Sequence, residues 1–252
     1  MAQRLLMAPA MNPARLLPGA LVVLAAALVA AGCGPSSRSA AGAAPDGPGA
    51  AAAALVGPHV HRGLRVEVDF VEGRRPGDAA LETLRQRLLE RTDHPDGVEV
   101  VLDDLLAPTG RERHTLEDVR ALGRLHRDAE AGDRGVIHVL VLDGEADPSL
   151  GHHLLGAAVG PTSIVLFPDA ILRAVGGSAT RAQDLLRWTL VHEAGHLLGL
   201  VNLGAPQAVS HEDLAKRGHC DQPGCVMRWS GDERVTDFCP RCKDDLRQLG
   251  GR

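Results

Sequence analysis

Tyrosine is absent from this chain of 252 residues, and aromatic residues of all kinds make up only 2% of it. A tyrosine hydroxyl can therefore serve neither as a metal ligand nor as an electrophile here. The core must be built from Leu, Val, Ile and Ala. Long basic runs are also missing and the net charge is −5, which gives no electrostatic support for nucleic-acid binding. The 44% hydrophobic and 23% charged residues are typical of a soluble globular protein.

The N-terminus has the pattern of an export signal. An apolar run over residues 16–31 follows two arginines and is too short for a membrane span. Small residues then precede Cys33. We predict a bacterial lipoprotein signal over residues 1–32 with Cys33 lipidated, the alternatives being an ordinary secretory signal or an uncleaved anchor. The expected location is the bacterial cell envelope, anchored to the membrane and facing the extracytoplasmic side.

Three regions follow from composition. Residues 33–57 are mostly Gly, Ala, Ser and Pro, which predicts a flexible tether. The folded domain is expected over residues 58–252. Within it, 58–200 would form an N-terminal subdomain and 201–252 a C-terminal metal-binding subdomain.

Strand and helix patterns alternate along the folded part. Apolar and charged residues alternate over 63–71, which predicts a half-buried strand, and the apolar run over 135–144 predicts a central strand covered on both faces. We expect further strands over 97–106 and 162–171, and helices over 77–92, 114–132 and 179–200. This order predicts an α/β fold with a mixed sheet. The irregular tail that follows needs a crosslink or a metal.

Residues 190–199 read LVHEAGHLLG and carry the main chemical signal. His192 and His196 are about one helical turn apart, so both imidazoles project from the same face with Cα atoms about 6 Å apart. Zinc favours imidazole nitrogen, and a catalytic zinc takes three protein ligands and a water. Glu193, beside the first ligand, is the expected general base for that water.

Four cysteines lie downstream of this helix as two close pairs. They are Cys220 with Cys225, and Cys239 with Cys242. The spacing predicts a structural zinc with four thiolate ligands. Two disulfides are the alternative, because an exported protein could form them.

These motifs together resemble the archaemetzincin branch of the metzincin metallopeptidases. In that family the third zinc histidine immediately precedes the first structural cysteine, as His219 precedes Cys220 here. A methionine two residues after the second cysteine forms a turn beneath the catalytic zinc, which implies that role for Met227. The resemblance implies a twisted mixed sheet packed with helices, including the zinc-binding helix, and a small zinc-stapled C-terminal subdomain. It covers residues 192–242.

The third zinc ligand is the point at which this chain departs from the family. The family has two residues between its glycine and its third histidine, whereas residues 200–218 intervene here and Asn202 stands in the usual place. An asparagine amide oxygen suits hard cations better than zinc. We predict His219 as the third ligand and keep His211 as the alternative. The spare histidine would then hydrogen-bond the substrate carbonyl or the tetrahedral intermediate.

The predicted function is zinc-dependent hydrolysis of peptide bonds by a lipid-anchored extracytoplasmic metallopeptidase. A peptide or protein substrate would lie extended along the strand expected at 162–171. The alternatives are a non-catalytic zinc-binding lipoprotein and an interaction module held by disulfides. We expect His138 to be a core residue with a polar partner, and His152 and His153 to lie in a solvated loop.

Overall fold

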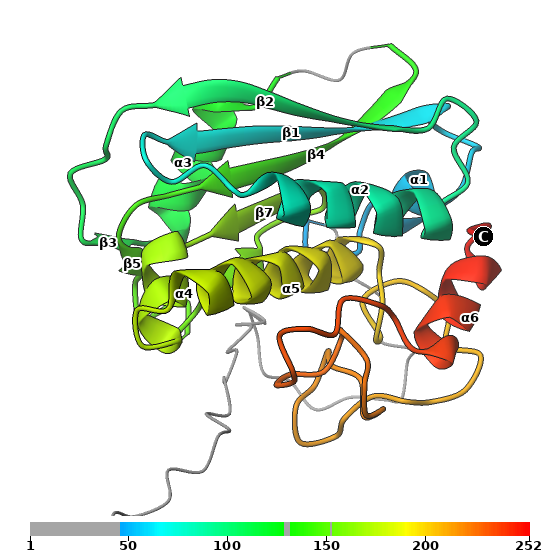
Figure 1. The fold of residues 1–252 in the computed structure, drawn as a ribbon. Coiled ribbons are helices and arrows are strands. Elements are labelled where there is room, and N and C mark those ends of the chain that lie inside the picture. Colours follow the sequence, from blue (N-terminus) through cyan, green and yellow to red (C-terminus); the bar gives the residue numbers. More distant parts are fainter. Residues whose placement is uncertain (1–45, 129–131, 152) are drawn as a thin grey trace, which may run out of the picture.

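A computed structural model describes residues 46–128, 132–151 and 153–252 (Figure 1). The expected signal over residues 1–32, the lipidation site Cys33 and His152 lie outside the described residues. Within the described ranges, no helix has the length and apolar character needed to cross a membrane.

A five-stranded sheet forms the centre of the fold, with the strand order β2-β1-β4-β7-β6. The strands are β1 (Gly63–Val71), β2 (Val98–Leu106), β4 (Arg134–Val141), β6 (Gly156–Ala158) and β7 (Ser163–Leu166). The first four in spatial order pair in parallel, and β6 pairs antiparallel to β7 at one edge. A separate two-stranded ribbon joins β3 (Arg113–His114) to β5 (Glu145–Ala146). The predicted α/β fold with a mixed sheet is therefore confirmed.

Helices cover both faces of this sheet. They are α1 (Ala52–Val56), α2 (Asp78–Arg91), α3 (Leu116–His126), α4 (Pro168–Ala174), α5 (Ala179–Leu197) and α6 (Pro240–Gln248). Helices α2 and α5 share one apolar cluster with the sheet, and α3 packs into a second cluster. The expected helix over 114–132 ends early, because the Asp128 N–H donates to the buried Glu67 carboxylate instead of to a helical carbonyl.

The tether predicted over residues 33–57 extends too far toward the C-terminus. Residues 52–56 form α1, and Ala52, Leu55 and Val56 are buried. The alanine-rich run ends in two larger apolar residues, so it can form a helix and bury one side of it. Residues 52–57 therefore belong to the fold.

Strand β1 is covered on both faces, so the expectation of a half-buried strand is wrong. Glu67 and Asp69, on the face expected to be solvated, are both 0% exposed. Asp69 accepts a 2.7 Å hydrogen bond from His138 Nε2 on β4, so this core histidine has a polar partner. Burial raises the pKa of Glu67. The alternating pattern failed because these charged side chains have partners inside the fold.

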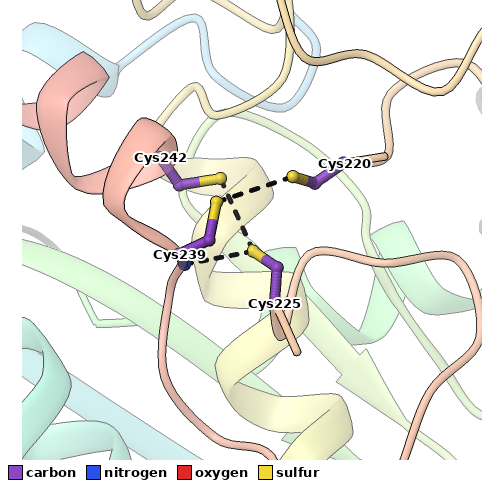
Figure 2. A group of neighbouring side chains, drawn as sticks. All are labelled: Cys220, Cys225, Cys239 and Cys242. Atoms are coloured by element: carbon purple, nitrogen blue, oxygen red, sulfur yellow. Dashed lines mark hydrogen bonds between the residues drawn. The ribbon is translucent and has the colours of Figure 1, made fainter. Parts of the chain in front are cut away.

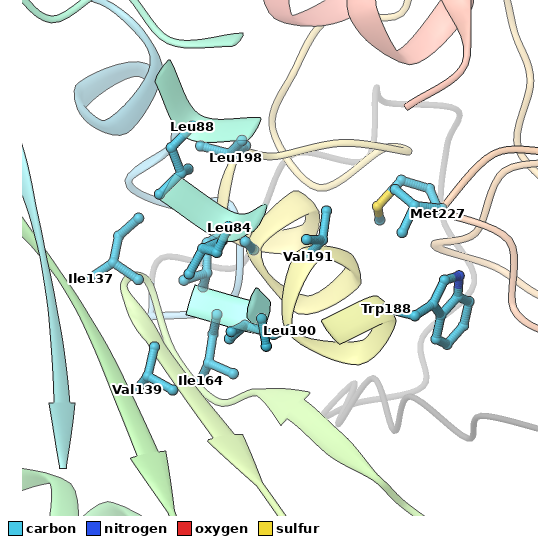
Figure 3. Close-up of a cluster of buried hydrophobic side chains, with 14 of the residues drawn as sticks. Leu84, Leu88, Ile137, Val139, Ile164, Trp188, Leu190, Val191, Leu198 and Met227 are labelled. Atoms are coloured by element: carbon cyan, nitrogen blue, oxygen red, sulfur yellow. The ribbon is translucent and has the colours of Figure 1, made fainter. Parts of the chain in front are cut away.

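The C-terminal segment 201–252 packs on the side of α5 that faces away from the sheet (Figure 1). Figure 3 shows Trp188 and Val191 of α5 beside Met227 of this segment, in the same cluster as Ile164 of β7. One core therefore runs from the sheet through α5 into the irregular tail. Helix α5 ends at Leu197, three residues before the end expected from the sequence, and Gly199 just beyond it has a φ of 80° that is unfavourable for other residues.

Candidate active site and cysteine cluster

Three histidines meet at the interface between α5 and the C-terminal segment. His192 and His196 come from α5, and His219 comes from the segment that packs on it; all three are buried. One ring nitrogen from each lies within 4.8 Å of the others. The Nε2 atoms of His192 and His196 are 3.1 Å apart. The structure thus brings together the two helix histidines and His219.

Backbone carbonyls orient two of the rings. The Nδ1–H of His192 donates to the Val226 carbonyl at 2.7 Å, and the Nδ1–H of His219 donates to the Arg217 carbonyl at 3.0 Å. In a neutral imidazole each Nε2 is then left with its lone pair. His219 Nε2 is buried without a hydrogen-bond partner in the part of the chain that the structure describes.

Burial disfavours the charged form of all three rings. Burial, together with the charge of a protonated His219, lowers the pKa of His192 to about 3. Burial is also the main cause that lowers the pKa of His196 and of His219. A zinc ion with Zn–N bonds of about 2.0–2.1 Å spaces its ligand nitrogens about 3.3 Å apart. Neutral, inward-facing nitrogens 3.1 Å apart fit that donor set.

Glu193 is buried between α5 and the edge strand β6. Its Oε2 accepts a 2.8 Å hydrogen bond from the Ala158 N–H, and its Oε1 has no partner among the described residues. Burial raises the pKa of Glu193 to about 8, and the bond from Ala158 opposes that rise. The carboxyl group of Glu193 thus lies one residue from the first histidine of the site.

The free edge of the sheet beside this carboxylate is β6. The expectation that the strand within 162–171 offers a pairing edge is wrong, because β4 and β6 occupy both sides of β7. Val159 N–H bonds to Ser163 across the β6–β7 pair, so the Ala158 N–H faces the open side. In the structure this outward-facing N–H donates its hydrogen bond to Glu193 Oε2.

The four C-terminal cysteines form a compact buried cluster (Figure 2). Their Sγ atoms all lie within 4.8 Å of one another, and the pairs Cys220–Cys239 and Cys225–Cys242 are each 3.7 Å apart. All four are free thiols, so neither alternative disulfide is formed. A tetrahedral zinc with Zn–S bonds of about 2.3 Å places its sulfurs about 3.8 Å apart. The cluster therefore fits a four-thiolate zinc site.

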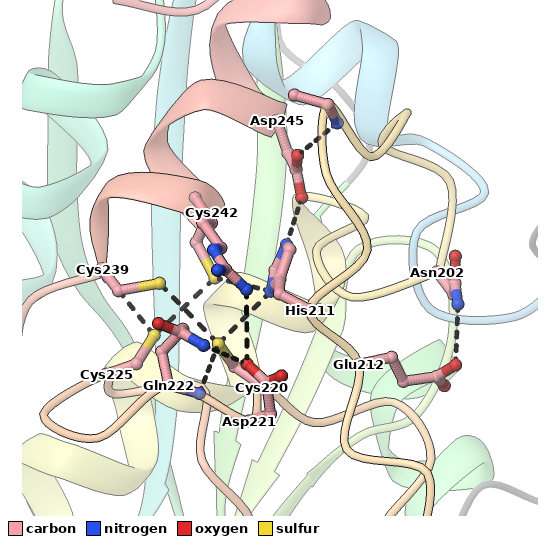
Figure 4. A network of polar contacts seen from close by, with 12 residues as sticks. Asn202, His211, Glu212, Cys220, Asp221, Gln222, Cys225, Cys239, Cys242 and Asp245 are labelled. Carbon is pink, nitrogen blue, oxygen red and sulfur yellow. Dashed lines mark hydrogen bonds and ion pairs between the residues drawn. The ribbon is translucent and has the colours of Figure 1, made fainter.

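His211 lies at the cysteine cluster and not at the three histidines (Figure 4). Its Nδ1 is 3.3 Å from Cys220 Sγ, and its Nε2 is 2.7 Å from Asp245 Oδ2. Burial lowers the pKa of His211, but the hydrogen bond and charge of Asp245 outweigh it and raise that pKa overall. The expectation that a spare histidine contacts substrate is wrong for His211, because both of its nitrogens are engaged in the interior. Asp245 was not predicted, and only its place near a cysteine pair could have indicated it.

Comparison with known proteins decides the family. An archaemetzincin from Pyrobaculum aerophilum is 31% identical over 145 residues, which cover 54% of this chain and 78% of the relative. The chain belongs to the archaemetzincin family. No family model matches it.

Two solved structures are more distant from this archaemetzincin. An archaemetzincin from Methanopyrus kandleri is 18% identical, covering 75% of this chain and 96% of the other, with a TM-score of 0.49. A zinc-dependent peptidase from Methanocorpusculum labreanum is 20% identical, covering 71% and 99%, with a TM-score of 0.46.

In this archaemetzincin, Met227 is fully buried against α5 at Gly195. A Cβ added at Gly195 would lie 2.3 Å from Met227 Sδ and 3.0 Å from Phe238. The glycine between Glu193 and His196 therefore lets the methionine approach the helix closely, next to the histidines.

Asn202 stands where the family's spacing would put a third histidine, but its side chain is hydrogen-bonded to Glu212. Its side-chain amide donates to Glu212 Oε2 at 2.8 Å (Figure 4). Glu212 Oε1 accepts from the Gly218 N–H at 2.9 Å. Glu212 was not predicted as a site residue. It links the start of the 200–218 segment to the residue before His219.

Proposed function

We propose that this archaemetzincin hydrolyses peptide bonds with a zinc ion held by His192, His196 and His219. The observation that carries the proposal is the donor set itself. Three neutral buried imidazoles converge, two of their Nε2 atoms are 3.1 Å apart, and the third has no partner in the described structure. Membership of the archaemetzincin family supports the same activity.

The residues around the ion divide the chemistry between them. Bound zinc supplies a Lewis acid that polarises the scissile carbonyl and lowers the pKa of water. Glu193 accepts the proton of the attacking water and passes it to the leaving amine. Its unpartnered Oε1 is the atom free to take that proton. The Val226 and Arg217 carbonyls keep the His192 and His219 rings in the tautomer that presents Nε2.

A substrate peptide would pair in extended form with the open side of β6. The Ala158 N–H faces that side, and a substrate carbonyl is a suitable acceptor for it. In the peptide-free structure the Ala158 N–H donates to Glu193 Oε2. A substrate carbonyl that accepts from this N–H instead would free Glu193 Oε2 for the reaction.

Replacing Glu193 by Gln tests the catalytic role. The glutamine side chain retains the size of the glutamate and an oxygen that accepts from Ala158, but it cannot accept a proton. We expect peptide hydrolysis to fall by about 10²- to 10⁴-fold, with zinc content unchanged. The exposed Glu112→Gln variant is the control and should be fully active. Retained activity in Glu193→Gln would refute Glu193 as the base.

The zinc sites are tested by metal analysis. We propose one zinc at the histidines and a second at Cys220, Cys225, Cys239 and Cys242. His219→Ala should lose the first ion and Cys242→Ser the second. Purified wild-type protein without bound zinc would refute both sites.

We also propose that the protein is a lipid-anchored enzyme of the bacterial envelope, on the sequence pattern that precedes Cys33. When the full chain is expressed in a bacterial host, wild type should incorporate labelled fatty acid and fractionate with membranes. Cys33→Ser should do neither. Equal labelling of both proteins would contradict lipidation at Cys33.

A further inference from the structure

A buried histidine–aspartate pair contacts the cysteine cluster from outside. His211 and Asp245 are 1% and 0% exposed, and the 2.7 Å bond between Nε2 and Oδ2 joins them. The other ring nitrogen, Nδ1, points at Cys220 Sγ from 3.3 Å. Figure 4 shows the three side chains in line, with Asp245 on α6, His211 in the 200–218 segment and Cys220 at the cluster.

We propose that His211 and Asp245 are positioning residues for the metal at the four cysteines. Asp245 orients the imidazole so that the Nδ1–H of His211 donates to Cys220 Sγ, and this bond attaches the 200–218 segment to the metal site. The inference rests on the proposed zinc at Cys220, Cys225, Cys239 and Cys242.

The geometry makes His211 a hydrogen-bond donor and not a fifth ligand. Four sulfurs already lie within 4.8 Å of one another, and His211 is outside that group. Its Nε2 is committed to Asp245, and a carboxylate there fixes a proton on Nε2. Because a thiolate faces Nδ1 and a carboxylate faces Nε2, both ring nitrogens carry hydrogen and the Nδ1–H donates a hydrogen bond to Cys220 Sγ.

The pair also belongs to a network centred on Cys220 Sγ, and His211 Nδ1 lies farther, 4.0 Å, from Cys242 Sγ. Cys220 Sγ receives a second hydrogen bond, from the Gln222 N–H at 3.4 Å. The second oxygen of Asp245 accepts from the Ala208 N–H at 3.0 Å. Asp245 therefore binds the 200–218 segment at both Ala208 and His211. Partners that orient a metal ligand commonly contribute 10- to 100-fold in metal affinity, and hydrogen bonds to a thiolate draw negative charge off the sulfur.

Cobalt substitution of the full-length protein tests the pair, because the sulfur-to-cobalt charge-transfer band reports only on the cysteine site. The variants are His211→Gln and the near-isosteric Asp245→Asn, and the exposed His59→Gln is the matched control. Loss of the N–H···S bond leaves Cys220 more electron-rich, so both variants should shift the band to lower energy. Zinc should also leave the cysteine site for a chelating dye at least about tenfold faster than in wild type.

The outcomes separate the inference from the proposed zinc site. If both variants show the same charge-transfer band and the same rate of zinc release as wild type, the role of His211 and Asp245 is refuted. The proposed zinc site at the cysteines is then unaffected. A wild-type protein without any such band refutes the cysteine metal site and the inference together. A purely structural role predicts lower thermal stability with no shift of the band. Asp245→Asn keeps the shape of the side chain, so it decides the matter if His211→Gln does not fold.

Discussion

The side-chain amide of Asn202 donates a 2.8 Å hydrogen bond to the carboxylate of Glu212. Asn202 has a left-handed backbone with φ of 67°, which asparagine tolerates better than most residues. Glu212 in turn accepts from the Gly218 N–H, directly before His219. Asn202, at the position where the family has its third histidine, therefore helps through Glu212 to fix the backbone directly before His219.

Replacing Glu212 by Gln should weaken metal binding at the three histidines. The amide is a poorer acceptor for both Asn202 and Gly218, so the chain entering His219 is held less firmly. We expect zinc affinity at the histidine site to fall by about tenfold, as for other residues that orient a ligand. The affinity is measured by competition with a chelating dye, and the second zinc should be unaffected.

Arg217→Ala is the control for this effect. Arg217 also bonds to Glu212, but its side chain is 69% exposed, and such a surface pair contributes little. Its loss should leave zinc affinity within about twofold. If Glu212→Gln binds zinc as tightly as Arg217→Ala does, Glu212 does not position His219.

Sequence patterns predict the parts of this protein that depend on local spacing. The α/β order of elements, the start of α5 at Ala179 and the one-turn spacing of His192 and His196 follow from periodicities of a few residues. The identity of the edge strand cannot be predicted in this way. Strand β6 has only three residues, and its antiparallel pairing with β7 depends on the tertiary fold. The burial of Glu67 and Asp69 escapes the pattern for a similar reason. Their partners, Asp128 and His138, lie more than 60 residues away in the chain.

Gly195→Ala should destabilise the fold although alanine favours a helix. The new Cβ would lie 2.3 Å from the Sδ of the fully buried Met227, so the methionine must move within a packed core. Overpacking of this kind costs about 1–3 kcal/mol. Chemical denaturation measures the change in the free energy of unfolding.

Two further variants check that contact. Gly231→Ala adds a Cβ whose nearest neighbour is 3.9 Å away, so it should be nearly neutral. Met227→Ala should rescue part of the Gly195→Ala defect, so that the double variant is more stable than the sum of the single changes predicts. Strict additivity would mean that Gly195 and Met227 do not interact as the structure indicates.

The metal-free protein should lose stability as the pH falls from about 6.5 towards 4.5. Burial depresses the pKa values of His192, His196 and His219 in the folded state, so the unfolded chain binds more protons over this range. Each histidine contributes up to about 1.4 kcal/mol per pH unit. Glu193 acts in the opposite sense, because its pKa is raised to about 8 and its contribution is lost as the pH rises.

The His192→Gln/His196→Gln double variant isolates that effect. Glutamine does not titrate, so the pH dependence of its unfolding free energy should be shallower between about pH 4.5 and 6.5 than that of wild type. Urea denaturation of both proteins in the presence of a chelator gives the two slopes. Parallel slopes would contradict the assignment of the acid sensitivity to these histidines.

The state of the four C-terminal cysteines can be counted directly. In the structure they are free thiols with paired sulfurs 3.7 Å apart, well beyond a disulfide bond of about 2.0 Å. In the Cys33→Ser background, denaturation with a chelator and without reductant should release four thiols that react with a colorimetric disulfide reagent. The native zinc-loaded protein should react slowly, because all four sulfurs are buried and would be shared with the metal. Fewer than four reactive thiols after denaturation would restore the disulfide alternative, and fast reaction of the native protein would argue against metal-bound thiolates.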